Sequence, residues 1–276
     1  PKSLDHLSTC KSPQQMFGAV AKTYYAQKFN IDPRNLVVIS IMPCTAKKFE
    51  CKRPEMNSAF HFWKDKIGLT EQDNFYDVDY VLTTRELAKM FKKIGVDFSN
   101  LQSEEFDEPL GISTGAGVIF GATGGVMEAA VRTAYEVVTG KSLASIDLTA
   151  VRGFEGIREA ELDLDGTKIK VAVAHTLKNA RTLLEQIEEG KSPYTFIEVM
   201  TCPGGCLGGG GQPIPTTWAI RQKRADSIYR EDKLHAVRKS HENPAIKAIY
   251  EEFLIEPLGH NSHELLHTHY VERGIY

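Results

Sequence analysis

The stretch TCPGGCLGGGGQP, residues 201–213, contains the side chains best suited to chemistry. Cys202 and Cys206 lie four positions apart around a pair of glycines, and four further glycines follow. Ordering a glycine costs about 0.5–1 kcal/mol more than ordering an alanine in regular structure, so this many glycines need a steric reason. A bulky iron–sulfur cluster provides one, because backbone N–H groups reach sulfide and thiolate sulfur only where side chains are missing. The pattern therefore predicts an iron–sulfur site.

The chain has five cysteines, widely scattered: Cys10, Cys44, Cys51, Cys202 and Cys206. An odd, sparse set is unlike the disulfide framework of a small secreted domain, which favours metal ligation or buried thiols. Cys44 and Cys202 each follow a predicted strand by two positions. Ligands gather at the carboxyl ends of strands in open parallel sheets, so we expect these thiolates to face one cleft. For Cys10 and Cys51 we expect small buried side chains.

The segment HELLH at 263–267 satisfies the zinc-hydrolase pattern H-E-x-x-H, with Glu264 as the candidate base. Only nine residues follow His267, and the continuation with a further glycine and histidine is absent. The alternative interpretation is a short amphipathic terminal helix that docks through Leu265 and Leu266. A zinc hydrolase is therefore a remote alternative.

The composition is that of an ordinary globular protein, with 276 residues, 42% hydrophobic and 25% charged, and a net charge of −3. This charge offers no attraction to nucleic acid or to anionic membranes, and the basic stretch Arg221 to Arg224 is interpreted as a solvated helix face. No apolar run reaches the roughly 18 residues of a membrane span, and no signal-peptide core is visible. We expect a soluble, cytoplasmic protein. A periplasmic location stays open because the chain begins at Pro1 rather than at a methionine.

Strand, loop and helix units alternate through the first two hundred residues. Apolar and β-branched runs predict strands at 36–42, buried on both faces, and at 78–84, 168–175 and 195–200. Apolar spacing and caps predict helices that start at Ser12 with Gln15 as capping-box partner, at the Thr83–Glu86 capping box, at 126 and at 180. Beyond Pro213 only helices are predicted, at 218–229, 245–254 and 262–270. The expected fold is α/β, with two lobes of mainly parallel sheets flanked by helices, the active site in the cleft between them, and a helical C-terminal tail.

Four motifs, in this order, resemble the active-site domain of the iron-only, or [FeFe], hydrogenases: STCKSPQQMFGA, MPCTAKKFE, GATGGVMEAA and EVMTCPGGCLGGGGQP. The resemblance covers essentially the whole chain, and the tail is similar to the family's small-subunit region. It implies a [4Fe-4S] cluster joined through a cysteine sulfur to a diiron unit with carbon monoxide, cyanide and a bridging dithiolate amine, together called the H-cluster. The implied activity is the reversible interconversion of protons plus electrons and dihydrogen.

The resemblance also assigns residues. Cys44 and Cys202 match ligands of the [4Fe-4S] cluster, and Cys206 matches the cysteine that binds this cluster and bridges to the diiron unit. Lys47 matches the lysine that pairs with a cyanide, where a fixed cation holds a metal-bound anion.

Two further residues, Glu50 and Ser8, match members of the proton relay, in which a carboxylate and a hydroxyl pass protons over hydrogen-bond distances. The alternative for Glu50 is a solvated surface carboxylate. The residues that match the surroundings of the diiron ligands are Pro43, Gln14, Met42, Met200 and Phe120.

One part of the family's pattern is absent. A cysteine pair followed by Pro-Gly-Trp lies upstream in the family and provides the fourth ligand of the [4Fe-4S] cluster and a proton-delivering thiol. We therefore expect an N-terminal segment or a partner chain to complete the site, and a ferredoxin or iron–sulfur or flavin subunits to exchange electrons. Residues 55–77 form a longer connection than in the family's simplest members, without an assigned role.

The expected organisation is a catalytic domain over 1–213, with lobes of about 1–105 and 106–213, and a helical tail over 214–276 that wraps the body. A hydrogenase is the leading function. A hydrogen sensor or a catalytically silent iron–sulfur module on the same scaffold is the second. The presence of the proton-delivering thiol from the upstream motif would distinguish the hydrogenase from the second function. The metal content would distinguish both from a zinc hydrolase.

Overall fold

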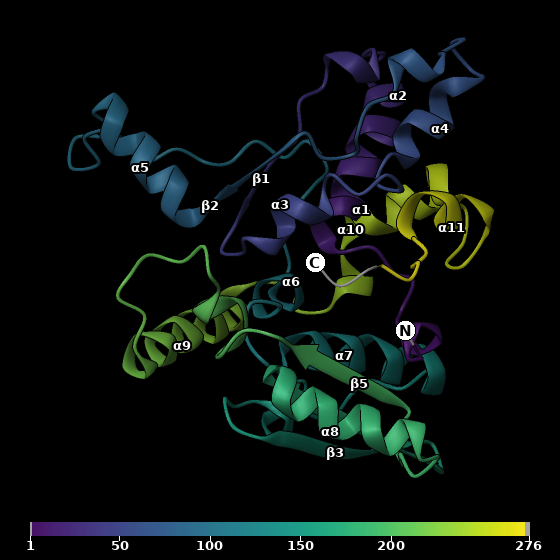
Figure 1. The fold of residues 1–276 in the computed structure, drawn as a ribbon, viewed down its shortest axis with the longest axis vertical. Coiled ribbons are helices and arrows are strands. Elements are labelled where there is room, and N and C mark those ends of the chain that lie inside the picture. Colours follow the sequence, from purple (N-terminus) through teal and green to yellow (C-terminus); the bar gives the residue numbers. More distant parts are fainter. Residues whose placement is uncertain (1, 274–276) are drawn as a thin grey trace. The chain divides into compact units, whose positions relative to one another are not determined.

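The computed structural model describes residues 2–273 (Figure 1). The chain divides into two compact units, one of Pro1–Gly111 with Lys247–Tyr276 and the other of Ile112–Ile246. Each unit combines helices with a sheet that contains a parallel strand pair, as the α/β prediction requires. Among residues 2–273, no helix has the length and apolar character that a membrane crossing needs.

The first unit is built around one long helix and a two-stranded parallel sheet. The helix starts as α1 (Pro13–Val20), passes through a π-helical turn (Ala21–Tyr25) and ends as α2 (Ala26–Lys28). The sheet pairs β1 (Ile39–Met42) with β2 (Tyr80–Thr83). The other helices are α3 (Ala46–Glu50), α4 (Ser58–Lys64), α5 (Thr84–Ile94) and α11 (His260–Leu266), with α10 (Pro244–Ile249) and a π turn (Tyr250–Leu254) leading into the last of them.

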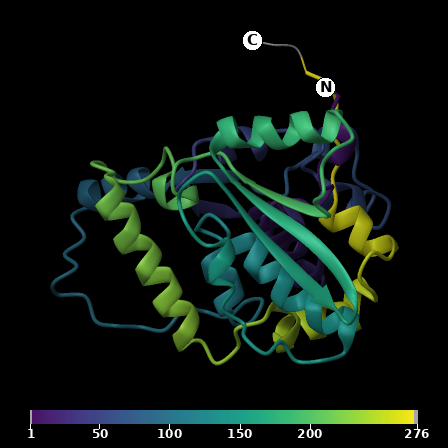
Figure 2. The same cartoon turned by 90° about the horizontal axis from the view of Figure 1, so that it is seen from below.

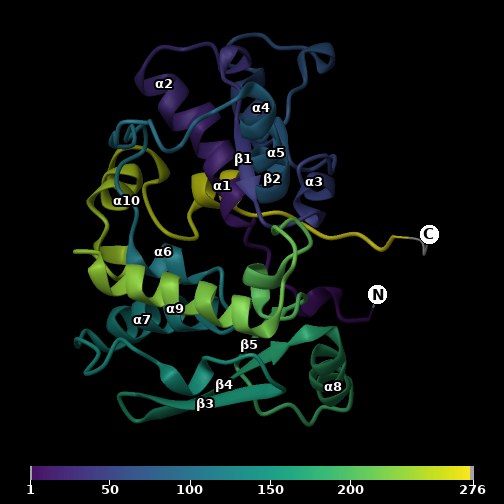
Figure 3. The same ribbon diagram turned by 90° about the vertical axis from the view of Figure 1, so that its left-hand side faces the viewer.

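The core of this unit joins its two ends in sequence. Val20 and Tyr24 of the long helix pack against Phe253 and Leu265, and α11 lies beside α1 (Figures 1 and 3). Leu265 is almost fully buried and Leu266 packs partly buried against the same cluster. The predicted docking of a short terminal helix through these two leucines is confirmed.

Strand β1 differs from its prediction. Only its last four residues are extended in a ladder, and Ile39 and Ile41 are 53% and 40% exposed on one face, whereas Ser40 on the other face is buried. The prediction of burial on both faces is wrong, because among the described residues only one face of β1 is covered. The capping box of α5 is confirmed, with Thr83 and Glu86 exchanging hydrogen bonds and Gly95 ending the helix at a φ of +74°.

Residues 55–77 form part of the packing of the first unit. Asp77 is buried, accepts hydrogen bonds from the backbone N–H groups of Ser58 and Ala59 at the start of α4, and pairs with the buried amine of Lys11 at 3.1 Å. The indole of Trp63 donates to the carbonyl of Lys22 at 2.7 Å. This segment therefore anchors both the long helix and the chain just before it.

The second unit is a mixed sheet between helices (Figures 2 and 3). Strands β3 (Ile157–Leu164) and β4 (Thr167–His175) form an antiparallel hairpin, and β5 (Phe196–Met200) pairs in parallel with β4. Helix α7 (Gly125–Thr139) packs on Val171 and Val173, whereas α8 (Thr176–Glu188) packs on Ala172 and Ala174 of the opposite face. The remaining helices are α6 (Gly115–Ile119) and α9 (Trp218–Leu234).

The sequence prediction missed β3. Its residues alternate between partly buried apolar and exposed charged side chains, a pattern of a strand with one solvated face. Because β3 pairs antiparallel with β4, this sheet is mixed rather than purely parallel. The parallel pair β4–β5 remains the part that leads to the cysteines.

A buried arginine joins α7 to α9. Arg132 is fully buried and donates to Glu128 at 2.6 Å and to both carboxylate oxygens of Asp232 at 2.8 and 2.9 Å. Arg152 and Arg238 pair with the same two carboxylates. Although Glu128, Asp147 and Asp232 lie close enough to hold a metal ion, arginines already occupy their carboxylates.

We expect Arg132→Met to lower the free energy of unfolding by about 3–5 kcal/mol, since removing one partner leaves buried charge uncompensated. Urea unfolding followed by circular dichroism measures the change. The control is Lys141→Met, whose pair with Asp165 leaves both side chains 60% exposed and should barely move the unfolding midpoint. Equal effects of the two substitutions would contradict a structural role for the buried network.

Candidate metal centre

Cys202 and Cys206 lie in the loop that follows β5. Met200, the last residue of β5, is the register partner of His175, the last residue of β4, so this loop leaves the carboxyl edge of the parallel pair. The loop is closed by hydrogen bonds from the Gly205 N–H to the Cys202 carbonyl at 2.9 Å and from the Gly209 N–H to the Cys206 carbonyl at 3.1 Å. Neither cysteine forms a disulfide, and both are partly buried. The predicted position of Cys202 at a strand end is confirmed.

Two glycines allow this loop to fold back on the backbone. A Cβ at Gly208 would lie 1.9 Å from the carbonyl oxygen of Pro203. Gly205 has a φ of +70°, and a Cβ there would lie 2.9 Å from the backbone nitrogen of Thr123. The steric reason for these two glycines is therefore the protein's own main chain. The close fold places the two cysteines at the two ends of one compact turn of the main chain.

His175 supports the loop from the sheet side. Its buried Nε2 accepts a hydrogen bond from the Gly204 N–H at 2.7 Å, and its ring contacts Phe154 and Trp218. Burial, with a further contribution from Arg221, lowers the pKa of His175 below its ordinary value. The ring is thus neutral at neutral pH and able to accept this bond. Sequence reasoning missed His175, although its place at the end of a strand beside the strand leading to Cys202 was a usable signal.

In the first unit, Lys47 and Glu50 form the centre of a polar cluster on α3, which begins two residues after Cys44. Glu50 Oε2 accepts hydrogen bonds from Lys47 Nζ at 2.8 Å, Ser12 Oγ at 2.8 Å and Gln14 Nε2 at 2.9 Å. Glu50 is therefore a fixed, partly buried carboxylate rather than a freely solvated one.

Ser12 is the N-cap residue of α1 and Pro13 begins the helix, as predicted, but the predicted capping box with Gln15 does not form. Its Oγ accepts no hydrogen bond from the first turn of the helix, and its hydroxyl donates a charge-assisted hydrogen bond to the Glu50 carboxylate. Ser8 lies in the same segment, where its Oγ accepts from the Cys10 N–H at 3.3 Å. The serine that contacts Glu50 is thus Ser12 and not Ser8.

One buried atom in this cluster lacks a partner. Gln14 is only 5% exposed, and its Oε1 has no hydrogen-bond partner among residues 2–273. A buried polar atom left without a partner costs about 1–3 kcal/mol. Gln14 Oε1 can therefore accept one more hydrogen bond, from the donor group of a bound molecule or from water.

The other predicted lining residues belong to different units, two to the first and two to the second. Pro43 and Met42 join β1 to Cys44, and Met200 ends β5 with a partly buried side chain. Phe120 packs partly buried against Ala116, Ile119 and Ala129, close in sequence to the strand-facing helix α7.

The two remaining cysteines differ in environment. Cys51 is buried, as predicted, and burial raises the pKa of its thiol. Cys10 is exposed, so the prediction of a buried thiol is wrong there. Its segment forms an isolated bridge with His267 at the edge of the unit rather than entering the core.

The HELLH segment brings the rings of His263 and His267 together, with their centres 4.4 Å apart. Glu264 lies 3.2 Å from His260, and His267 lies outside α11 with its Nδ1 hydrogen-bonded to Thr9 Oγ1 at 2.7 Å. Within residues 2–273, no group of three potential metal ligands includes His263 or His267.

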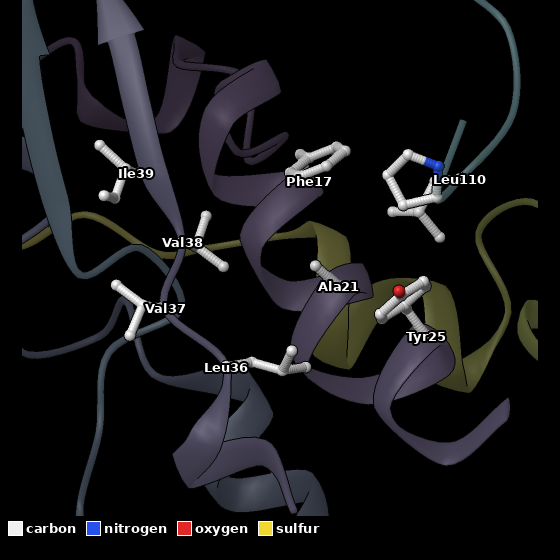
Figure 4. A pocket seen from close by; sticks show the side chains of 9 residues that line it. Phe17, Ala21, Tyr25, Leu36, Val37, Val38, Ile39 and Leu110 are labelled. Carbon is white, nitrogen blue, oxygen red and sulfur yellow. The ribbon is translucent and has the colours of Figure 1, made fainter. Parts of the chain in front are cut away.

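An open apolar pocket of about 280 Å³ lies elsewhere in the first unit, between the long helix and the segment leading into β1 (Figure 4). Phe17 and Tyr25 line one side, and Leu36 and Val38 line another. Its lining contains none of the predicted metal ligands. The pocket is therefore separate from the polar cluster around Glu50.

Comparison with known proteins identifies the class of this α/β protein. Residues 1–210 match the family model described as "Iron only hydrogenase large subunit, C-terminal domain", and residues 219–273 match "Iron hydrogenase small subunit". The chain belongs to the iron-only hydrogenase family.

Individual relatives agree with this family. The chain is 50% identical over 99% of its length to the NADP-reducing hydrogenase subunit HndD of Solidesulfovibrio fructosivorans, covering 44% of that protein. It is 51% identical over 78% of its length to the periplasmic [Fe] hydrogenase large subunit of Nitratidesulfovibrio vulgaris, covering 48% of it. A more distant relative is Protein NAR1 of Arabidopsis thaliana, 30% identical over 97% of this chain and 54% of that protein. The chain thus spans about half the length of the curated relatives it matches.

The solved structure of an apo variant of [FeFe]-hydrogenase HydA1 from Chlamydomonas reinhardtii matches with a TM-score of 0.80 and 41% identity. The match covers 100% of this chain and 72% of that one. The α/β fold with its helical C-terminal part is therefore the fold of this family.

We expect Gly208→Ala to reduce the iron and sulfide bound after anaerobic reconstitution several-fold, because a Cβ would collide with the Pro203 carbonyl and open the cysteine turn. Iron and sulfide analysis measures the loss. The control is Gly117→Ala in α6, where the nearest atom to a Cβ is 3.8 Å away. Full iron binding by Gly208→Ala would show that the tight turn is not needed.

Proposed function

We propose that this chain is the cluster-binding part of an [FeFe]-hydrogenase, and that the complete protein interconverts protons plus electrons and dihydrogen. The observation that carries the proposal is the compact turn that presents Cys202 and Cys206 at the carboxyl edge of β4–β5. Identity of 50% to a hydrogenase subunit over nearly the whole chain supports it.

In this proposal Cys44, Cys202 and Cys206 bind a [4Fe-4S] cluster, and Cys206 also bridges to a diiron unit. A fourth thiolate comes from another segment of the protein or from a partner chain. When bound, the H-cluster supplies the redox-active metal at which protons and dihydrogen interconvert. The cysteine turn supports this role because backbone hydrogen bonds hold the main chain at both cysteines.

The polar cluster of the first unit has two tasks in this proposal. Lys47 provides a fixed cation for an anionic metal ligand, and its pair with Glu50 orients the amine before the ligand binds. Glu50 can hold a proton on its carboxylate, and Ser12 can pass one through its hydroxyl over 2.8 Å. Ser8 extends the proposed relay along the same segment. Pro43, Met42, Met200 and Phe120 supply apolar surroundings that limit water.

A catalytically silent iron–sulfur module is the second candidate. The similarity to Protein NAR1 supports it, because the scaffold extends to proteins not named as hydrogenases. The lower identity of that relative, 30% against 50%, favours the hydrogenase.

The surrounding system is also part of the proposal. A hydrogenase needs an electron partner, for which we propose a ferredoxin or iron–sulfur or flavin subunits. One relative is named as a subunit of an NADP-reducing hydrogenase, which supports further subunits. We place the protein in the cytoplasm. One relative is named periplasmic, so cell fractionation decides between these compartments.

Infrared spectroscopy of the anaerobically matured, full-length protein tests the cofactor. We expect carbonyl and cyanide bands in the wild type, and we expect Cys206→Ala to lose them together with hydrogen evolution. Cys10→Ala, which removes an exposed thiol, should retain both. Bands and activity that survive Cys206→Ala refute the bridging role, and zinc without iron in the wild type overturns the proposed function.

The relay is tested by Glu50→Gln, which keeps the shape of the side chain but removes its charge and most of its basicity. We expect hydrogen evolution to fall about 100-fold, in the range of general acid–base catalysis, while the carbonyl and cyanide bands remain. Glu251→Gln changes an exposed carboxylate of the same unit and should leave the rate unaltered. A normal rate in Glu50→Gln would remove Glu50 from the relay.

A further inference from the structure

The basic stretch at the start of α9 does not form the solvated face that its sequence predicts. Arg224 donates to the Leu207 carbonyl in the cysteine loop at 2.7 Å. Arg221, one turn earlier, lies along the same loop, and only Lys223 is an exposed cation of this stretch. Two of its three cations thus contact the loop that contains Cys202 and Cys206.

The path of the Arg221 side chain is defined by two glycines. A Cβ at Gly204 would lie 3.0 Å from Arg221 Cδ, and a Cβ at Gly208 would lie 2.7 Å from Arg221 Nε. These glycines precede and follow Cys206 by two residues. The guanidinium also stacks on Trp218, with its Cζ 4.4 Å from the ring centre. Arg221 is therefore held alongside the turn around Cys206.

Among residues 2–273, no carboxylate forms a salt bridge with Arg221. Its Nε is buried and has no hydrogen-bond partner in the part of the chain that the structure describes. Arg132 in the same unit shows the usual alternative, with its guanidinium on two carboxylates. A buried N–H on a charged group without an acceptor is expensive, more so than for a neutral group. The position therefore suits an anionic group that brings its own acceptor atoms.

We propose that Arg221 faces the iron–sulfur cluster bound by Cys202 and Cys206 and raises the reduction potential of that cluster. This inference rests on the proposed function, because it requires a cluster at these cysteines. A [4Fe-4S] cluster with thiolate ligands carries net negative charge and gains one more on one-electron reduction. A fixed cation nearby stabilises the reduced form more than the oxidised one, and charge and hydrogen bonds to sulfur are known determinants of the potential.

The test uses the full-length protein with its [4Fe-4S] cluster assembled from iron and sulfide but without the diiron unit. A redox titration followed by electron paramagnetic resonance gives the midpoint potential of the cluster. We expect Arg221→Gln to bind the same amount of iron as the wild type. At a fixed potential, we expect its ratio of reduced to oxidised cluster to be about tenfold lower, which equals about 59 mV for one electron. Arg221→Lys, which keeps the charge, should change this ratio less than threefold.

Lys223→Gln is the matched control, because it removes the same charge from the same helix at an exposed position. An unchanged potential in Arg221→Gln, or an equal shift in Lys223→Gln, would overturn the inference. If Arg221→Gln does not assemble a cluster, the test depends on Arg221→Lys. A tenfold change of the reduced-to-oxidised ratio in that variant, which keeps the charge, would exclude an effect of charge. Failure of the wild type to assemble any iron cluster would instead refute the proposed function.

Discussion

The candidate centre depends on one constraint, the close approach of the cysteine loop to other main-chain atoms. Gly208 packs against the Pro203 carbonyl, and Gly205 packs against the backbone of residues 121–123. No side chain fits at either position without a shift, so these contacts restrict the course of the backbone around Cys206. A metal centre gains from this arrangement because its ligands are ordered before binding, and less conformational entropy is lost when the metal enters.

The elements around that turn are held by buried charges. In the second unit, Arg132 joins α7 to α9, and α9 in turn carries Arg221 and Arg224 to the loop. In the first unit, the buried pair of Lys11 and Asp77 holds the segment from which the Ser12 hydroxyl reaches Glu50. A buried ion pair adds little net stability, yet losing one partner is costly. Such pairs therefore serve here to fix the positions of segments that carry polar side chains.

Much of the fold could be predicted from local patterns. The Thr83–Glu86 capping box, the helix that ends at Gly140 and the strands that end at His175 and Met200 were all correct, because each depends on neighbours in sequence. Strand β3 was missed since its alternating charges resemble a solvated loop. The exposed face of β1 could not be predicted from the sequence. An apolar strand has the same composition whether both of its faces are buried or only one.

The site residues that escaped prediction share one physical cause. The Ser12 hydroxyl donates to a carboxylate 38 residues away, and His175 accepts from a glycine 29 residues further along the chain. Arg221 lies along the cysteine loop, and its Nε has no hydrogen-bond partner among residues 2–273. In each case the side chain contacts residues that are distant in sequence, and this contact could not be predicted from local patterns. Such disagreements between local pattern and structure are expected at functional sites. These conflicts between sequence pattern and structure, rather than the agreements, therefore mark the chemically important part of the molecule.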